Sequence, residues 1–211
     1  HSDSSAASDV YKRQVISRLS EQGMKTLDEL SIAPSPLGSE ELNSEAGIAE
    51  LDNSAVLKWS DGLMETHHLV RNVRKATLEK ETLSRMHHNE AKKWSAKEGE
   101  RARKIEAYHR SMSGQDDDVE WIEENIRLIS IHDSSIAAVV IENALNLNDN
   151  QKLRSNAALL ALDRGETRIA QIHIAKMNHS PSKKLFESRL ARMDGRTVSY
   201  THLRAHETRT H

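Results

Sequence analysis

The sequence predicts an all-α protein in which a long charged, coiled-coil-like helix is followed by a bundle or short solenoid of helical hairpins. Three observations predict this class. Aromatic residues make up only 3% of the 211 residues, whereas β-sheets favour aromatic and β-branched side chains. Apolar residues recur every three or four positions, which is the period of a helix with one buried face. Proline and glycine gather in a few short segments that can separate such helices.

The first predicted part, residues 15–54, combines a short helix with a linker. Residues 15–30 have the pattern of a helix interrupted at Gly23. Residues 31–54 carry five acidic side chains and no basic one, together with two prolines. So polar a segment buries too little apolar surface to offset the entropy cost of ordering it. We therefore expect residues 31–54 to be a flexible acidic linker.

Residues 55–112 form the predicted long charged helix. They contain no proline and carry thirteen Lys or Arg side chains against eight Asp or Glu. Apolar side chains from Val56 to Ile105 keep helical spacing. An unbroken helix of this length spans about 87 Å at roughly 1.5 Å per residue. We therefore expect it to pair as a coiled coil, with itself or a partner, or to fold back near residues 87–89 or at Gly99.

Residues 113–197 are predicted to be a helical-hairpin domain that continued beyond this piece of chain. Apolar period and capping residues predict five helices, at about 118–131, 135–147, 149–163, 166–178 and from Pro181 onward. We expect Asn148 to begin the third helix, Gly165 to end it and Gly195 to end the fifth, because glycine favours helix C-termini.

A weak internal repeat lies within this domain. The triplet Ala137, Ile141 and Ala144 stands 33 residues before Ala170, Ile174 and Met177. This pattern of small and large residues is similar to the second helix of a tetratricopeptide repeat, and NAALLALDRGETRIA resembles that repeat's first helix and turn. The resemblance covers residues 119–193 and lacks the tryptophan of the family's first helix. It implies stacked hairpins that bind proteins in a groove.

The sequence therefore predicts a non-enzymatic protein-protein interaction or scaffolding module, with no catalytic residue and no cofactor. Its expected partner is another protein, or a second copy through the long helix. The chain has no cysteine, which favours a reducing compartment, and we expect it in the cytoplasm. No apolar stretch is long enough to predict a membrane span.

The first alternative is a metal-binding helical bundle. Two Glu-x-x-His motifs occur, Glu65 with His68 and Glu106 with His109. Residues three apart share a helix face, so each motif can present a carboxylate and an imidazole to a metal. The pattern of bundle di-iron sites needs two further glutamates from other helices, and we therefore favour surface side chains over a metal site.

The second alternative is nucleic-acid binding through the bases of residues 92–110. Glutamates interleave with these bases at the four-residue spacing of salt bridges, which favours a solvated helix instead. His132, Asp133 and Ser134 hold the residue types of a hydrolase triad, but we interpret Asp-Ser-Ser as a helix start. We expect His173 to be a half-buried helix residue and not a ligand.

The two ends of the chain differ from the rest. The string DVYKRQ at residues 9–14 can be encoded by DNA whose reverse complement, in another frame, encodes VSYTH at residues 198–202. Residues 4–14 and 198–208 resemble translated adapter from a transposase-made sequencing library. The resemblance implies that residues 1–14 and 198–211 are not native and that the insert was cut from a longer reading frame.

Overall fold

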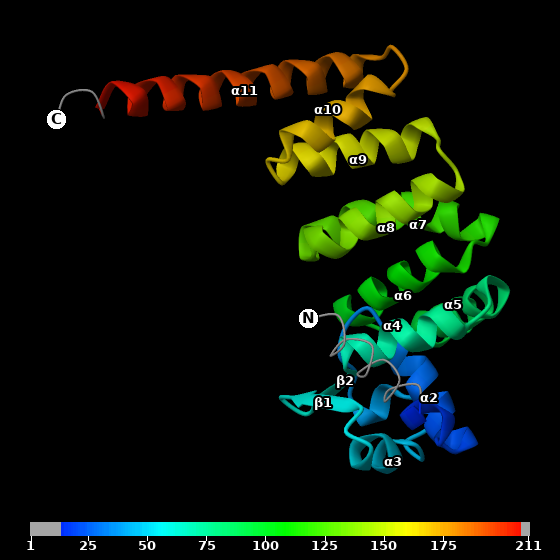
Figure 1. Ribbon diagram of the computed structural model, residues 1–211. Helices are drawn as coiled ribbons and strands as arrows, with labels where there is room; N and C mark the ends of the chain where they lie inside the picture. The colour runs from blue at the N-terminus through cyan, green and yellow to red at the C-terminus, as the bar shows by residue number, and fades with distance from the viewer. Residues whose placement is uncertain (1–13, 208–211) are drawn as a thin grey trace. The chain divides into compact units, whose positions relative to one another are not determined.

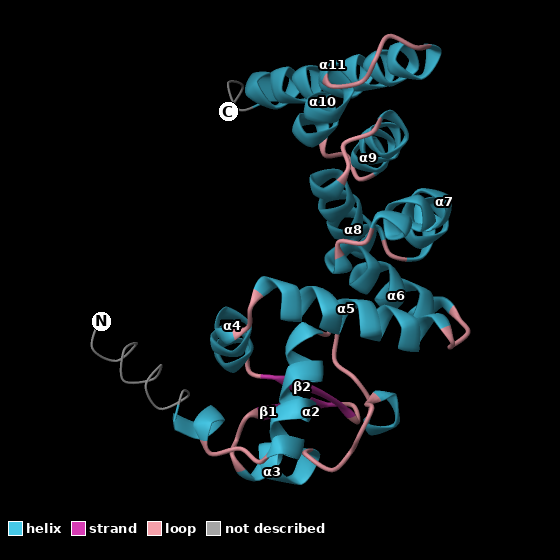
Figure 2. Ribbon diagram, turned by 90° about the vertical axis from the view of Figure 1, so that its right-hand side faces the viewer, coloured by secondary structure: helices cyan, strands magenta, loops and turns pink. Residues whose placement is uncertain are grey.

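The structure is a computed structural model that describes the backbone of residues 14–207 and the side chains of residues 14–195. The described chain is mainly helical, which confirms the all-α class, and its strands form one two-stranded sheet. Figure 1 and Figure 2 show the elements. The chain divides into two compact units, His1–Glu90 and Ala91–His211, which we describe separately as unit 1 and unit 2. None of the described helices has the length and apolar character needed to cross a membrane.

Unit 1 is built around α2, which packs against α3, α4 and β2. Its elements are α2 (Glu21–Ile32), the 3-10 helix η1 (Ser39–Glu41), α3 (Ile48–Asn53), β1 (Leu57–Ser60), β2 (Leu63–Thr66), α4 (His68–Thr77) and the part of α5 (Lys80–Ser95) up to Glu90. The core consists of fully buried aliphatic side chains from these elements, Leu27, Leu30, Ile32, Leu37, Leu51, Val56 and Met64. Helix α2 runs through Gly23 without the predicted interruption.

A β-hairpin stands where the sequence predicted the start of the long helix. Strands β1 and β2 pair antiparallel, with Trp59 opposite Met64. The turn between them places Asp61 at φ 51° and Gly62 at φ 78°. An Asp-Gly pair with both residues at positive φ is the preferred two-residue connection of a hairpin, because its twist matches that of the strands. The long-helix prediction is wrong here because the turn chemistry outweighs the apolar spacing.

The predicted linker, residues 31–54, is instead packed into unit 1. Leu37 exchanges two backbone hydrogen bonds with Met64, at 2.9 and 2.7 Å. Leu37 and Leu51 are both buried in the core. The prediction of a flexible linker is wrong because these two apolar side chains gain their partners from α2 and the hairpin, which local composition does not reveal.

The remainder of the predicted long helix is divided into α4, α5 and α6 (Glu100–Ser113). Helix α5 runs without a break through residues 87–89, so the fold-back predicted there is wrong. The break at Gly99 is confirmed, because Gly99 precedes α6 with φ 103°, a conformation that glycine adopts without strain. A coiled coil through one long helix, and self-association by that route, therefore lose their basis.

Unit 2 is a succession of helices in which each packs on the next and most pack on the next but one. After α6 come α7 (Asp116–His132), α8 (Ser134–Leu147), α9 (Gln151–Asp163), α10 (Thr167–Ala175) and α11 (Pro181–Glu207). Helix α6 contacts α7 and α8, α9 contacts α7 and α8, and α11 contacts α9 and α10. This arrangement of antiparallel hairpins follows the five helices predicted from sequence closely.

The apolar stripes of these helices form two buried clusters. The first joins α7, α8 and the start of α9 around Ile122, Ile141 and Leu153, with Ala107 of α6. The second joins α9, α10 and α11 around residues that include Ala170 and Phe186. Burying such aliphatic side chains contributes about 1.5–3 kcal/mol each. The clusters therefore hold consecutive hairpins together in one stack.

Glycine ends α9 as predicted but does not end α11. After α9, the Gly165 N–H donates to Leu162 O (3.2 Å) and the Glu166 N–H to Ala161 O (2.9 Å), with Gly165 at φ 73°. These paired bonds are a Schellman C-cap. Helix α11 continues through Gly195 to Glu207. The prediction for Gly195 is wrong because glycine inside a helix costs only about 0.5–1 kcal/mol, too little to stop it.

Helix α9 begins after Asn150 and not at Asn148. The Asn150 Oδ1 accepts from the N–H groups of Lys152 and Leu153, both at 3.0 Å, and its Nδ2 donates to Glu123 of α7 at 2.5 Å. We expect Asn150→Ala to lower the free energy of unfolding of unit 2 by about 1–2 kcal/mol, because two N–H groups lose their acceptor. Urea denaturation monitored by circular dichroism measures the change. Asn146→Ala, on exposed α8 surface, is the control, and an equal loss there would contradict the cap assignment.

Candidate functional site

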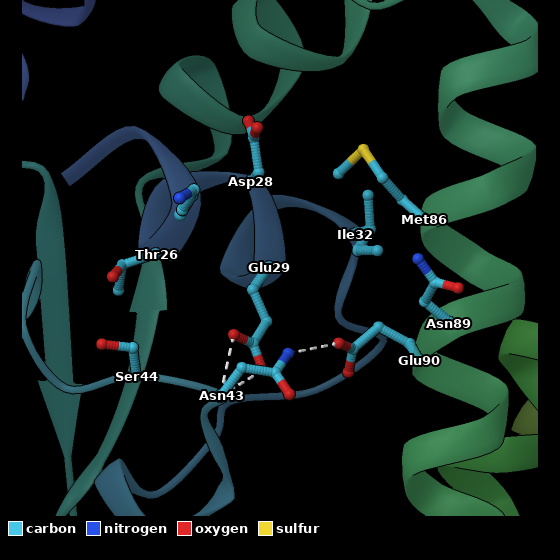
Figure 3. Close-up of a pocket in the computed structure, with 10 residues that line it drawn as sticks. Thr26, Asp28, Glu29, Ile32, Asn43, Ser44, Met86, Asn89 and Glu90 are labelled. Atoms are coloured by element: carbon cyan, nitrogen blue, oxygen red, sulfur yellow. Dashed lines mark hydrogen bonds between the residues drawn. The ribbon is translucent and has the colours of Figure 1, made fainter. Parts of the chain in front are cut away.

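Unit 1 contains a cavity of about 320 Å³ between α2, the segment before α3 and the first part of α5. Figure 3 shows its wall, to which α2 contributes Asp28, Glu29 and Ile32 and α5 contributes Met86 and Glu90. This volume lies at the lower end of the range for small-molecule sites. The cavity is therefore the first place to test for binding or catalytic chemistry.

Asn43 connects the two buried carboxylates of this cavity. Its backbone N–H donates to both carboxylate oxygens of Glu29, at 3.0 Å each, and its side-chain Nδ2 donates to Glu90 Oε1 at 2.9 Å. Glu29 and Glu90 are both buried. Buried carboxylates need such hydrogen bonds to offset the loss of hydration. Asn43 therefore joins α2 to α5 through the wall of the cavity.

The third acid of the wall, Asp28, is engaged by Arg74 of α4. Arg74 Nε donates to Asp28 Oδ1 at 2.5 Å and Nη2 to Oδ2 at 3.0 Å, which is a bidentate pair. The hydrogen bonds to Asp28 raise the pKa of Arg74 above its ordinary value. Lys25 also lines the cavity, and its Nζ lies 2.6 Å from Glu21 Oε1 at the surface.

The two hydroxyls in this wall, of Thr26 and Ser44, bind backbone groups and are not arranged for nucleophilic catalysis. The Ser44 Oγ accepts from the Ala46 N–H at 3.2 Å. The Thr26 hydroxyl donates to the backbone oxygen of Gln22 at 3.1 Å, in its own helix, and not to a base. A catalytic hydroxyl needs a base within hydrogen-bond reach. Asn43 links Glu29 of α2 to Glu90 of α5, while Asp28, Lys25 and Thr26 bind residues outside the wall. The cavity is therefore explained best as the joint between these elements.

Unit 2 presents a smaller groove of about 100 Å³ between α7, α8 and α9. Apolar side chains from all three helices line it, among them Ile126, Ile131, Ile141 and Leu159, together with the polar side chains of Arg127, Ser130, Asn156 and Asp163. Ile131 is 77% exposed, the largest value among the exposed large apolar side chains of the described chain. An aliphatic side chain of that exposure beside a groove gains free energy when a partner covers it. The groove is therefore a candidate contact surface.

A buried charge network holds α6 to α7. Arg110 Nε donates to Glu106 Oε1 at 2.8 Å and Nη1 to Asp118 Oδ1 at 2.5 Å, while the Ser113 hydroxyl donates to the other Asp118 oxygen. The guanidinium lies 4.7 Å from the ring centroid of Trp121. Burial lowers the pKa of Arg110, but the bonds to both carboxylates outweigh burial and raise it. Arg110 therefore neutralises two buried acids.

A second network links α8, α9 and α10 through His173. The His173 Nε2 lies 2.9 Å from Glu142 Oε1 of α8, and its Nδ1 lies 3.1 Å from Arg154 Nη1 of α9. Arg154 in turn forms two contacts with Asp149, one of them from Nε to Oδ1 at 3.0 Å. His173 and Arg154 are both buried. The expected half-buried histidine is thus part of an ordered chain of polar groups.

The two Glu-x-x-His motifs fall in different units. Glu65 lies in β2 and pairs with Lys58 (3.2 Å) and Arg71 (3.8 Å), while His68 is the first residue of α4. The first motif therefore lacks the helical geometry expected for a metal site. Glu106 and His109 do share α6, but both are buried, so the expectation of surface side chains is wrong for this motif. Glu106 binds Arg110. Among the described residues no three His, Asp or Glu side chains group so as to hold a metal ion.

Two of the basic residues of the second alternative, Lys104 and Arg110, form ion pairs within the chain. Arg110 is held by Glu106 and Asp118, as described above. Lys104 lies 3.7 Å from Glu100 and 3.6 Å from Asp133. Lysines that pair in this way offer little free positive charge to a phosphate backbone.

The residues with triad-like types have structural roles. The Asp133 Oδ1 accepts from the N–H groups of Ser135 (3.2 Å) and Ile136 (3.0 Å) and caps α8. His132 pairs with Glu100 at 3.2 Å. The interpretation of Asp-Ser-Ser as a helix start is therefore confirmed, with Asp133 as the capping residue.

Sequence reasoning missed the polar groups that organise both units, above all Asn43, Arg154 and Asp118. Arg154 and Asp118 lie inside helices with polar neighbours, where nothing local marks them as buried. A signal was present only for Glu106 and Arg110, whose four-residue spacing predicts an ion pair.

Comparison of the chain with protein-family models, with curated proteins and with solved structures gave no match. Function must therefore be argued from the geometry alone.

Proposed function

We propose that this chain is a non-enzymatic protein-protein interaction module whose unit 2 binds a segment of another protein. The observation that carries the proposal is the groove between α7, α8 and α9, with the 77% exposed Ile131 at its side. Stacks of helical hairpins use such grooves to bind extended or helical peptides. The absence of cysteine supports a cytoplasmic setting.

The repeat in unit 2 supports a solenoid of the tetratricopeptide type. The triplets that stand 33 residues apart, Ala137, Ile141 and Ala144 and then Ala170, Ile174 and Met177, are buried in or directly after equivalent helices, α8 and α10. Small side chains at these positions let neighbouring helices approach closely. Such repeats leave the opposite helix faces open to partners.

Selection of peptides from a random displayed library against the whole chain tests this proposal. We expect enriched peptides with aliphatic or aromatic side chains, and we expect Ile131→Glu to weaken their binding about tenfold or more, because a charge then replaces the exposed aliphatic side chain at the edge of the groove. Ile131 is solvent-exposed, so the substitution should leave the helical circular dichroism unchanged.

Val139→Glu is the matched control for this experiment. Val139 is a 47% exposed aliphatic residue on α8 that does not line the groove. The proposal requires that this variant bind the selected peptides as the wild type does. Equal loss in both variants, or a selection that enriches nothing, would contradict it.

A further inference from the structure

We propose that His173 is a pH-sensitive switch whose neutral ring links α10 to α8 and α9, and whose protonation breaks the hydrogen bond to Arg154 of α9. The inference does not depend on the proposed peptide groove. It rests on the positions of two ring nitrogens, since one contacts a carboxylate of α8 and the other contacts a guanidinium of α9. Both contacts have hydrogen-bond length, at 2.9 and 3.1 Å, and the imidazole is buried.

The neighbours of His173 determine which nitrogen carries the proton. An arginine side chain has only donors and stays charged at every ordinary pH, so Arg154 must donate to His173 Nδ1. The Nδ1 therefore offers its lone pair, and the ring proton lies on Nε2. From there it is donated to Glu142 Oε1. The native arrangement is thus the neutral Nε2–H tautomer.

A second proton on the ring is incompatible with this arrangement. It would occupy Nδ1 and point at the N–H group of Arg154, placing two donors against each other at 3.1 Å. The guanidinium is fixed on its other side by Asp149 and is itself buried. Protonation therefore forces either the Arg154 side chain or α10 to move, and it breaks the hydrogen bond between His173 and Arg154.

The charges that face His173 come from several elements. Glu142 on α8 favours the protonated ring, whereas Arg154 on α9 and Lys176 directly after α10 oppose it. Asp149, in the loop before α9, is bound to Arg154, and that hydrogen bond lowers the pKa of Asp149. Burial is the largest influence, and the net effect is to lower the pKa of His173 below its ordinary value. The folded stack therefore excludes a proton that the unfolded chain accepts.

The sign of the pH effect follows from this difference. The unfolded chain binds a proton on this histidine at about pH 6.5. Folded unit 2 resists it, so the unfolded or opened form binds more protons as the pH falls below that value. The hydrogen bond from Arg154 of α9 to His173 of α10 is therefore fully present at pH 7.5 and is lost progressively in mildly acidic solution.

Nuclear magnetic resonance of the imidazole nitrogens in the whole chain tests the tautomer directly. We expect His173, assigned by comparison with His173→Gln, to show the neutral Nε2–H form at pH 7.5 and a titration midpoint below 6.5. Glu142→Gln, at an exposed position, removes the carboxylate that contacts the ring and favours its protonation, and it should move the midpoint lower still. The Nδ1–H tautomer, or a midpoint above 6.5, would overturn the proposal.

Amide hydrogen exchange of Thr167–Ala175 in the whole chain tests the mechanical consequence. After correction for intrinsic exchange rates, we expect the opening equilibrium constant of α10 to rise in acid. The total rise should be about tenfold for each unit by which the pKa of His173 is lower in the folded than in the unfolded chain. His173→Gln should abolish this pH dependence. His68→Gln, which removes an exposed histidine of unit 1, should preserve it. Wild-type exchange in α10 that does not change between pH 7.5 and 5 would refute the switch.

Discussion

Arg110→Met is expected to lower the free energy of unfolding of unit 2 by about 3–5 kcal/mol. Arg110 neutralises Glu106 and Asp118, both of which are buried. Methionine retains much of the aliphatic stem but removes the positive charge, so two buried carboxylates are left facing each other without a cation. Chemical denaturation monitored by the helical circular dichroism signal measures the loss.

The cost has a specific cause that two further variants isolate. Arg103→Met removes an exposed arginine from the same helix, and we expect its effect to stay within about 0.5 kcal/mol. In Arg110→Met, acidification should restore part of the lost stability, because protonating Glu106 or Asp118 removes the unpaired charge. Adding Asp118→Asn to Arg110→Met should restore part of it at neutral pH. Equal losses for Arg103→Met and Arg110→Met would show that the network contributes nothing.

Unit 2 is the part of the chain whose fold the sequence predicts well. Its helices carry regular apolar stripes, and several begin or end at a residue with clear capping chemistry. Ser180 illustrates this, because its hydroxyl accepts from the Lys183 N–H at 3.2 Å directly before Pro181 starts α11. In this region the local sequence signals and the tertiary packing favour the same helices, so the sequence alone predicts where they lie.

Unit 1 is harder to predict because its local signals conflict. Trp59 and Leu63 have helical spacing, yet Asp61 and Gly62 between them are the strongest short-range signal for a hairpin, and the turn determines the structure. Leu37 lies in a segment of linker-like composition and still reaches the core by pairing with Met64. Contacts between residues so far apart in sequence cannot be derived from a window of one segment.

The candidate sites show the same limit. The spacing of Glu65 and His68 implies a shared helix face only if both residues are helical, and Glu65 lies in a strand. The network of His173 joins residues of three helices whose spacing follows no motif. The network can be recognised only in the folded chain, where packing brings Glu142 and Arg154 to opposite sides of the His173 ring. Polar networks of this kind are a property of the tertiary structure.

Unit 1 is expected to lose about 2 kcal/mol of stability between pH 7 and pH 5, and about 3 kcal/mol by pH 4, through His87 alone. His87 lies on α5 and is only 1% exposed. Burial, with a smaller contribution from the positive charge of Lys75, lowers the pKa of His87 to about 4. The folded unit therefore keeps this ring neutral throughout the range in which the unfolded chain protonates it.

The direction of this effect is fixed by proton binding. Between about pH 6.5, the ordinary pKa of histidine, and the folded value near 4, the unfolded state holds a proton on His87 that the folded state lacks. Each step toward acid in this window therefore favours unfolding. Below the folded value both states are protonated, and the contribution of His87 no longer changes.

Amide exchange in α2 of the whole chain measures the opening free energy of unit 1 separately from unit 2. His87→Leu keeps a buried side chain of similar bulk without a titrating group, so its stability should fall less steeply with acid than that of the wild type. The slope between pH 7 and 5 is the quantity compared, because the absolute stability at pH 7 also depends on how leucine packs. His67→Gln, at an exposed position in the same unit, should keep the wild-type slope. A slope for His87→Leu equal to that of the wild type would show that the buried imidazole is not what makes unit 1 sensitive to acid.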